Sequence, residues 1–251
     1  AGLLYAGTEW GMYVSFDEGK HWQSFQLNLP HVPVTDIEVH RQDLVLSTQG
    51  RAFWVIDDLT PLHQISDKIS LSANHFFSPR PVYRSNVGFG RASLKAIAGE
   101  GFDSTTPVSL KVIDSKGNII RSYSSDADNR LNKISFSKAV NNFSWDLRHQ
   151  GPTLVDNLVT MVIRNPSPGP RAVPGVYTLE LQIGDWSDKQ TIEIKPDPRW
   201  TDVGQEDYEA QLVKSLEIRD ILTDAHQRIS NIRSIRQQIE MLADMAVTAG
   251  Y

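Results

Sequence analysis

Apolar and polar positions alternate in short runs along the first part of the chain, as expected for half-buried β-strands. The pattern repeats with a shift of forty residues, so that segment 3–17 aligns with segment 43–57. Several short strands at a period of about 40–45 residues are typical of β-propeller blades. We therefore predict partial blades over residues 1–65, with strands at 3–7, 12–16, 22–26, 35–40, 43–47 and 53–57.

Alternation returns in the middle of the chain. "PVSLKVID" and "IIRSYSS" flank the turn "SKGN", which is a hairpin signature, and "NNFSWDLR" reads as a further strand. The stretch 174–198 predicts a second hairpin, closed through residues 184–188, whereas the Gly-rich stretch 88–103 gives no clear assignment. With a linker included, we predict an antiparallel β-sandwich of immunoglobulin-like type over residues 66–198.

The period changes to that of a helix near the C-terminus. No Pro or Gly occurs from Gln205 to Ala246, and apolar residues recur mostly at steps of three or four. Residues 199–251 therefore predict either a long amphipathic helix that pairs with another segment or chain, or a helical hairpin. Thr201 or Asp202 is the expected N-cap. The expected interface residues are Leu222, Ile229, Ile232 and Ile239. The fold class is thus mainly β with a C-terminal α segment.

Composition narrows the range of partners. The net charge of -5 disfavours a nucleic-acid groove, and no apolar stretch reaches the roughly 20 residues of a membrane span. There are no cysteines, and the seven histidines show no metal-ligand spacing. We expect no metal, no cofactor, no nucleic-acid partner and no membrane span.

One short motif joins two of the predicted strands. Ser15, Asp17, Gly19 and Trp22 stand in the order Ser-x-Asp-x-Gly-x-x-Trp. Short Ser and Asp side chains accept backbone N–H bonds in turns, and glycine adopts positive φ without steric cost. Trp22 would then cover the turn with an apolar ring. We favour this structural role over a catalytic role for Asp17.

This motif resembles the Asp box of BNR-repeat, sortilin-like propellers, with His21 where Thr is usual. "TQGRAFWVIDD" (48–58) is similar to the phrase "THGRSFWILDD", which closes the propeller in bacterial glycosyl-hydrolase-like members of that family. The resemblance covers most of the chain. It implies the C-terminal part of a longer protein, with the rest of the propeller as its partner. It also favours a secreted or periplasmic location, although no signal peptide is present in the sequence given.

Two functions from different classes follow. The favoured one is a non-catalytic scaffold and interaction module that forms homo-oligomers through the C-terminal helix. The alternative is part of a glycosidase-like hydrolase whose active site lies mostly in missing N-terminal blades, with a carbohydrate or peptide as ligand. Glu9 is then the weak candidate acid or base, Trp10 a sugar-stacking platform and Arg51 an anion contact. A structural reading instead pairs Glu9 with Arg51 between adjacent blades.

Overall fold

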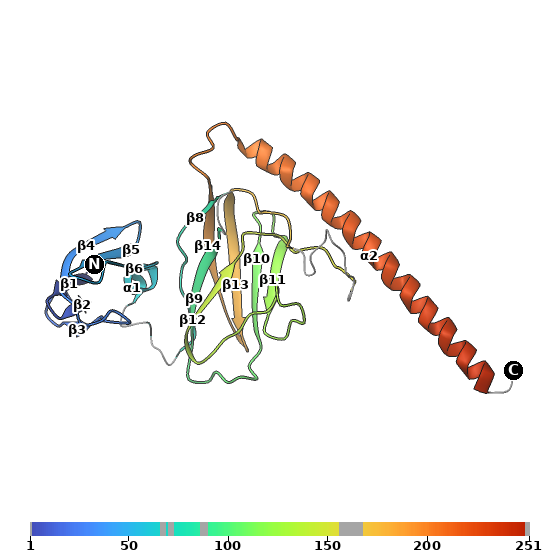
Figure 1. The fold of residues 1–251 in the computed structure, drawn as a ribbon, viewed down its shortest axis with the longest axis horizontal. Helices are drawn as coiled ribbons and strands as arrows, with labels where there is room; N and C mark the ends of the chain where they lie inside the picture. Colours follow the sequence, from blue (N-terminus) through green and yellow to red (C-terminus); the bar gives the residue numbers. More distant parts are fainter. Residues whose placement is uncertain (1, 66–68, 70–72, 86–89, 156–167, 249–251) are drawn as a thin grey trace.

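The computed structural model describes residues 2–65, 69, 73–85, 90–155 and 168–248. The protein is mainly β with a C-terminal helix, as the sequence predicts. Two three-stranded antiparallel sheets form the N-terminal unit (Figure 1). The first contains β1 (Leu4–Thr8), β2 (Gly11–Ser15) and β3 (Gln23–Ser24). The second contains β4 (Val34–His40), β5 (Asp43–Thr48) and β6 (Phe53–Ile56), and α1 (Thr60–Gln64) follows it.

The two N-terminal sheets share one small core. Met12 of β2 and Leu44 of β5 are both fully buried in it, together with Leu59 at the start of α1. Gly7 of β1 packs directly against β4, because a Cβ there would stand 2.6 Å from Cγ1 of Val34. All six predicted strands of this unit are confirmed, with ends that differ by a few residues.

Two larger sheets form the middle of the molecule. One has the order β11 (Ile119–Ser124), β10 (Val108–Ile113), β13 (Gly175–Ile183), β14 (Trp186–Pro196) and β8 (Val82–Arg84). The other has the order β12 (Ala139–Trp145), β9 (Ala92–Ala98) and β7 (His75–Phe76). Neighbouring strands are antiparallel, except that β14 and β8 run parallel. Alternate residues of both sheets enter one core, in which Trp145 is completely buried.

Two details of these sheets differ from the sequence prediction. The β13–β14 hairpin closes more tightly than predicted, because Ile183 pairs with Trp186 and only two residues, Gly184 and Asp185, form the turn. The Gly-rich stretch left unassigned contains β9, which pairs with β12 along its full length. Whether the larger sheets form an immunoglobulin-like sandwich, and the smaller ones propeller blades, stays a prediction.

A single helix, α2 (Gln205–Thr248), ends the described chain and excludes the predicted helical hairpin. The absence of Pro and Gly within it removes any reason for a break. The predicted caps are wrong, because the helix begins after Gly204, whose N–H donates to the Asp207 carboxylate at 2.8 Å. The carboxylates of Glu206 and Asp207 in the first turn also interact favourably with the positive end of the helix dipole and so stabilise the start of the helix.

An ion pair joins the N-terminal unit to the larger sheets. Nζ of Lys95 on β9 lies 2.8 Å from Oδ2 of Asp58 and 2.9 Å from the Asp58 carbonyl oxygen. Asp58 is buried and adopts a positive φ of 64°, whereas its neighbour Asp57 is exposed. A second pair, between Arg80 and Asp43 at 2.6 Å, lies near the same junction. The acidic pair that ends β6 therefore connects the two parts of the fold through Asp58.

Candidate functional site

The first half of α2 is attached to the larger sheets. The guanidinium of Arg84 on β8 lies 4.5 Å from the ring centroid of Tyr208, and its Nη2 donates to Gln211 at 2.6 Å. Further along, the backbone N–H of Val155 donates to Nδ1 of the buried His226 at 3.2 Å. These contacts hold the helix by a cation–π interaction and by polar bonds in partly dehydrated surroundings.

The second half of α2 lies open to solvent. Every side chain described from Asn231 to the end of the helix is exposed, and α2 extends beyond the sheets in Figure 1. Four of these residues form an apolar stripe: Ile232 (66 % exposed), Ile235 (56 %), Ile239 (61 %) and Leu242 (61 %). Steps of three, four and three residues place them at the a and d positions of a heptad. We call these four residues the distal stripe.

The flanks of this region are polar. An ion pair joins Arg236 to Glu240 at 2.8 Å along the helix, and another joins Asp224 to Arg228 at 2.8 Å. Pairs at this i,i+4 spacing give modest support to an exposed helix. The polar flanks therefore help to keep the helix formed where the rest of the chain does not cover it.

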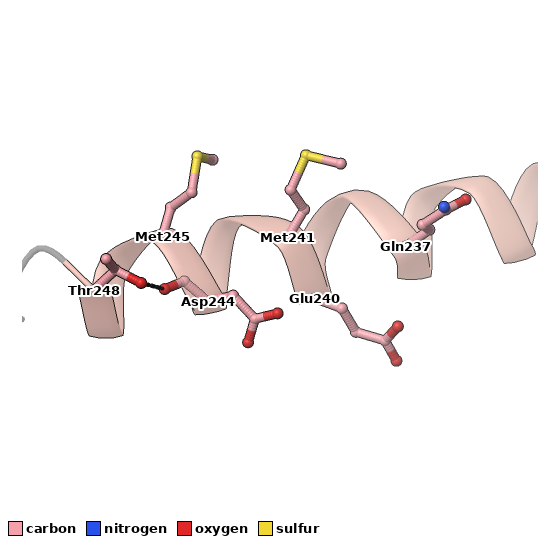
Figure 2. Close-up of a pocket in the computed structure, with 6 residues that line it drawn as sticks. All are labelled: Gln237, Glu240, Met241, Asp244, Met245 and Thr248. Atoms are coloured by element: carbon pink, nitrogen blue, oxygen red, sulfur yellow. Dashed lines mark hydrogen bonds between the residues drawn. The ribbon is translucent and has the colours of Figure 1, made fainter.

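Figure 2 shows the C-terminal end of the same helix. Met241 and Met245 project from one side, while the carboxylates of Glu240 and Asp244 project from another. All six residues that line this hollow belong to α2 itself, so it is an open helix face rather than a cleft between elements. Flexible methionine side chains adapt readily to an apolar partner. This face adds to the exposed apolar area outside the distal stripe.

The predicted helix interface divides into two parts. Leu222 and Ile229 are half-buried, and Leu222 borders a hollow that Pro152 and Pro170 also line. Ile232 and Ile239 are exposed and belong to the distal stripe. Ile235 and Leu242 complete the stripe; both belong to the apolar pattern that predicted the helix, although the four interface residues named from the sequence do not include them.

The Ser-x-Asp motif forms a hydrogen-bonded turn between β2 and β3. The Ser15 hydroxyl donates to Asp17 at 2.8 Å and accepts the Gly19 N–H at 2.9 Å. Asp17 also accepts the His21 N–H at 2.9 Å. This backbone bond and the contacts from the His21 ring and Ser15 hold the pKa of Asp17 well below its usual range. A Cβ at Gly19, whose φ is +87°, would lie 3.7 Å from the Trp22 ring.

The candidate hydrolase residues lie on two exposed loops. Trp10, in the β1–β2 loop, is 71 % exposed, and its carbonyl oxygen is 3.3 Å from Nδ1 of His31. Glu9 and Arg51 are exposed as well. Within the described residues their side chains make no ion pair or hydrogen bond with each other or with any third group. The expected Glu9–Arg51 pair is therefore not formed in this structure.

The described residues contain neither a candidate membrane span nor a candidate metal site. No helix among them combines the length and the apolar character needed to cross a bilayer. In the same residues, no group of three or more His, Asp or Glu side chains is arranged to hold a metal ion.

Comparison with known proteins places the chain in no family. No family model, no curated protein and no solved structure matches it.

Proposed function

We propose that this chain is a non-catalytic interaction module that self-associates through the second half of α2. The observation that carries the proposal is the distal stripe, in which Ile occupies both a positions and Leu one of the two d positions. In parallel coiled coils, β-branched residues at a combined with Leu at d favour two strands. A second copy of the same helix supplies the complementary surface, because each stripe fits a stripe of the same spacing.

The exposed areas set the expected affinity. Burying a fully exposed Ile or Leu side chain is worth about 1.5–3 kcal/mol, so side chains that are 56–66 % exposed contribute about 1–2 kcal/mol each. Eight such side chains in a pair give about 8–16 kcal/mol, of which association consumes about 4–15 kcal/mol. The surplus of a few kcal/mol corresponds to dissociation constants in the micromolar to millimolar range.

Sedimentation velocity over a wide concentration range tests this proposal. We expect the wild-type chain to form a dimer with rising concentration, and the variant Ile232→Asp/Ile239→Asp to stay monomeric. Ser234→Asp/Gln237→Asp adds the same charge on the opposite side of the helix and should dimerise as wild type does. A wild-type chain that stays monomeric at the highest concentration, or an Ile variant that dimerises unchanged, would refute the proposal.

We further propose that the N-terminal sheets are partial blades of an Asp-box propeller and that the larger sheets form an immunoglobulin-like sandwich. The forty-residue repeat supports the first part, because it places β1 on β5 and β2 on β6. Phe53 (75 % exposed) and Val55 (55 %) leave an apolar face on β6 of the kind that a neighbouring blade would cover. The shared core around Trp145 supports the sandwich.

A structure of the chain together with the residues that precede it in its natural protein tests the propeller proposal. We expect further blades to close a ring against β6 and to bury Phe53 and Val55. An open β6 face in that longer protein, with both side chains still in solvent, would contradict it.

A further inference from the structure

A hollow of about 310 Å³ lies between the edges of the two larger sheets, away from α2 and from the N-terminal unit. Its apolar lining comes from Leu110 on β10, Phe143 on β12 and Ile134 in the β11–β12 connection. Tyr123 of β11 adds an aromatic wall. A volume of this size, partly lined by apolar and aromatic groups, is at the lower end of small-molecule sites.

Three cations surround this hollow: Arg91, Arg130 and Lys133. Within the described residues none of them has an ion-pair partner, and the one polar contact of their side chains is from Arg91 to the Ser144 hydroxyl at 3.5 Å. Asp146 is the single acidic group in the lining. The hollow is therefore strongly cationic in a chain whose net charge is -5.

A fourth cation lies directly behind the wall. Arg121 is only 2 % exposed, and its guanidinium stands 4.9 Å from the ring centroid of Tyr123. Its Nη2 donates to the Leu131 carbonyl oxygen at 2.6 Å and lies 3.9 Å from the Asp146 carboxylate. Among the described residues its Nε has no hydrogen-bond partner. A buried guanidinium with incomplete pairing is unfavourable, and a nearby negative charge would offset that cost.

Asp146 does not neutralise the hollow. Its carboxylate is the closest anion to Arg121, and it also accepts the Tyr123 hydroxyl at 3.4 Å. One carboxylate thus serves a buried cation and a hydroxyl, while Arg91, Arg130 and Lys133 keep unpaired charge around the opening. Arginine and lysine in such an arrangement are typical partners of carboxylates and phosphates.

We propose that this hollow binds a small organic anion, with a carboxylate or phosphate group among Arg91, Arg130 and Lys133 and an apolar body against Phe143 and Ile134. The inference is independent of the helix pairing, since none of these residues lies on α2. The cations supply attraction and orientation for the charged head, and the apolar lining removes the body of the ligand from water.

Phenyl phosphate is a suitable probe, with phenol as its neutral counterpart and inorganic phosphate as its head alone. Binding is followed by NMR shifts of backbone amides near residues 131–135 and 142–144. We expect dissociation constants for phenyl phosphate of about 1 mM or tighter, as suits a small ligand, with weaker binding at higher salt. Phenol and inorganic phosphate should each bind at least about tenfold more weakly, because phenol lacks the charged group and inorganic phosphate lacks the apolar ring.

Charge-removing variants locate the site. Arg130→Gln/Lys133→Gln should weaken phenyl phosphate binding about tenfold or more, since two charge-assisted contacts are lost. Lys20→Gln/Lys116→Gln removes the same charge from exposed positions elsewhere and should bind as wild type does. Arg91→Gln provides an independent variant on a different strand edge. Equal binding of phenol and phenyl phosphate, equal binding of inorganic phosphate, no saturable shift, or unchanged affinity in the Arg130 and Lys133 variant would each overturn the proposal.

Discussion

Replacing Lys95 by Met should destabilise the junction between the N-terminal unit and the larger sheets. Lys95 is 16 % exposed in its side chain and Asp58 is 5 % exposed, so their bond is largely shielded from water. The substitution keeps most of the apolar stem and removes the ammonium group. It leaves the Asp58 carboxylate with the Thr60 N–H at 3.2 Å as its remaining hydrogen bond and takes the donor from its carbonyl oxygen.

The expected cost follows from this geometry. Removing one partner of a buried ion pair costs about 3–5 kcal/mol, because the other charge stays buried without compensation. We take the lower end, about 3 kcal/mol, since Lys95 keeps some contact with solvent. The double variant Lys95→Met/Asp58→Asn removes both charges while Asn still tolerates positive φ. It should regain a large part of the lost stability.

The pH dependence gives a second readout of the same pair. Burial alone would raise the pKa of Asp58, but hydrogen bonds from Lys95 and Thr60 and the charge of Lys95 outweigh it and lower the pKa. A lowered folded-state pKa means that the stabilisation is present above the unfolded value of about 4 and is lost as the pH falls through the folded value. This acid-dependent part of the stability should be smaller in Lys95→Met.

Urea unfolding followed by tryptophan fluorescence measures both effects, with the wild type, Lys95→Met, Asp58→Asn and the double variant compared at pH 7 and in acid. Arg91→Met, at an exposed position of the same segment, controls for the loss of a cation without a buried partner. A change below about 0.5 kcal/mol in Lys95→Met, as expected for a surface substitution, would show that the pair does not hold the junction.

Two further predictions concern other buried polar groups. Ser15→Ala should lower the free energy of unfolding in urea by about 1–2 kcal/mol, because the Ser15 hydroxyl is 1 % exposed, accepts the Gly19 N–H and donates to Asp17. A free energy of unfolding equal to that of wild type would contradict the structural role of this turn. Burial lowers the pKa of His149 to about 4, and the nearby charge of Arg219 lowers it further, by more than Asp114 raises it. Stability should therefore fall as the pH drops from about 6.5 towards 4, because the unfolded chain takes up a proton that the folded chain does not. The variant His149→Gln should flatten this pH dependence.

Local patterns predicted the elements well. Alternation located β4 and β5, and the unbroken 3–4 spacing located α2, since both signals depend on near neighbours in the sequence. β9 was missed because its alanines and the glycines around it give a weak alternation; pairing with β12 and burial on one face make it a strand.

The candidate sites were harder to predict. Arg91 on one side of the hollow and Arg130 and Lys133 on another come from two distant stretches of the sequence that only the fold brings together. No local sequence motif could therefore predict the hollow. Asp58 and Asp57 look equivalent in the sequence, and only the positive φ at Asp58 turns one carboxylate inward to Lys95. The division of α2 into an attached and an open half depends on tertiary contacts, from Arg84 of β8 and from Val155 in a loop, that the helix sequence does not show.

The unbroken course of α2 has a mechanical consequence. At about 1.5 Å per residue the helix is roughly 66 Å long, and nothing in its sequence provides a hinge. In a parallel pair, the arrangement in which Ile at a and Leu at d favour two strands, the centre of each distal stripe would stand roughly 16 Å along the axis from His226 of the same helix. The helix would then act as a rigid spacer that holds the paired distal stripes at a set distance from each β body, and each cationic hollow, which contains no residue of α2, could bind its ligand independently of the other.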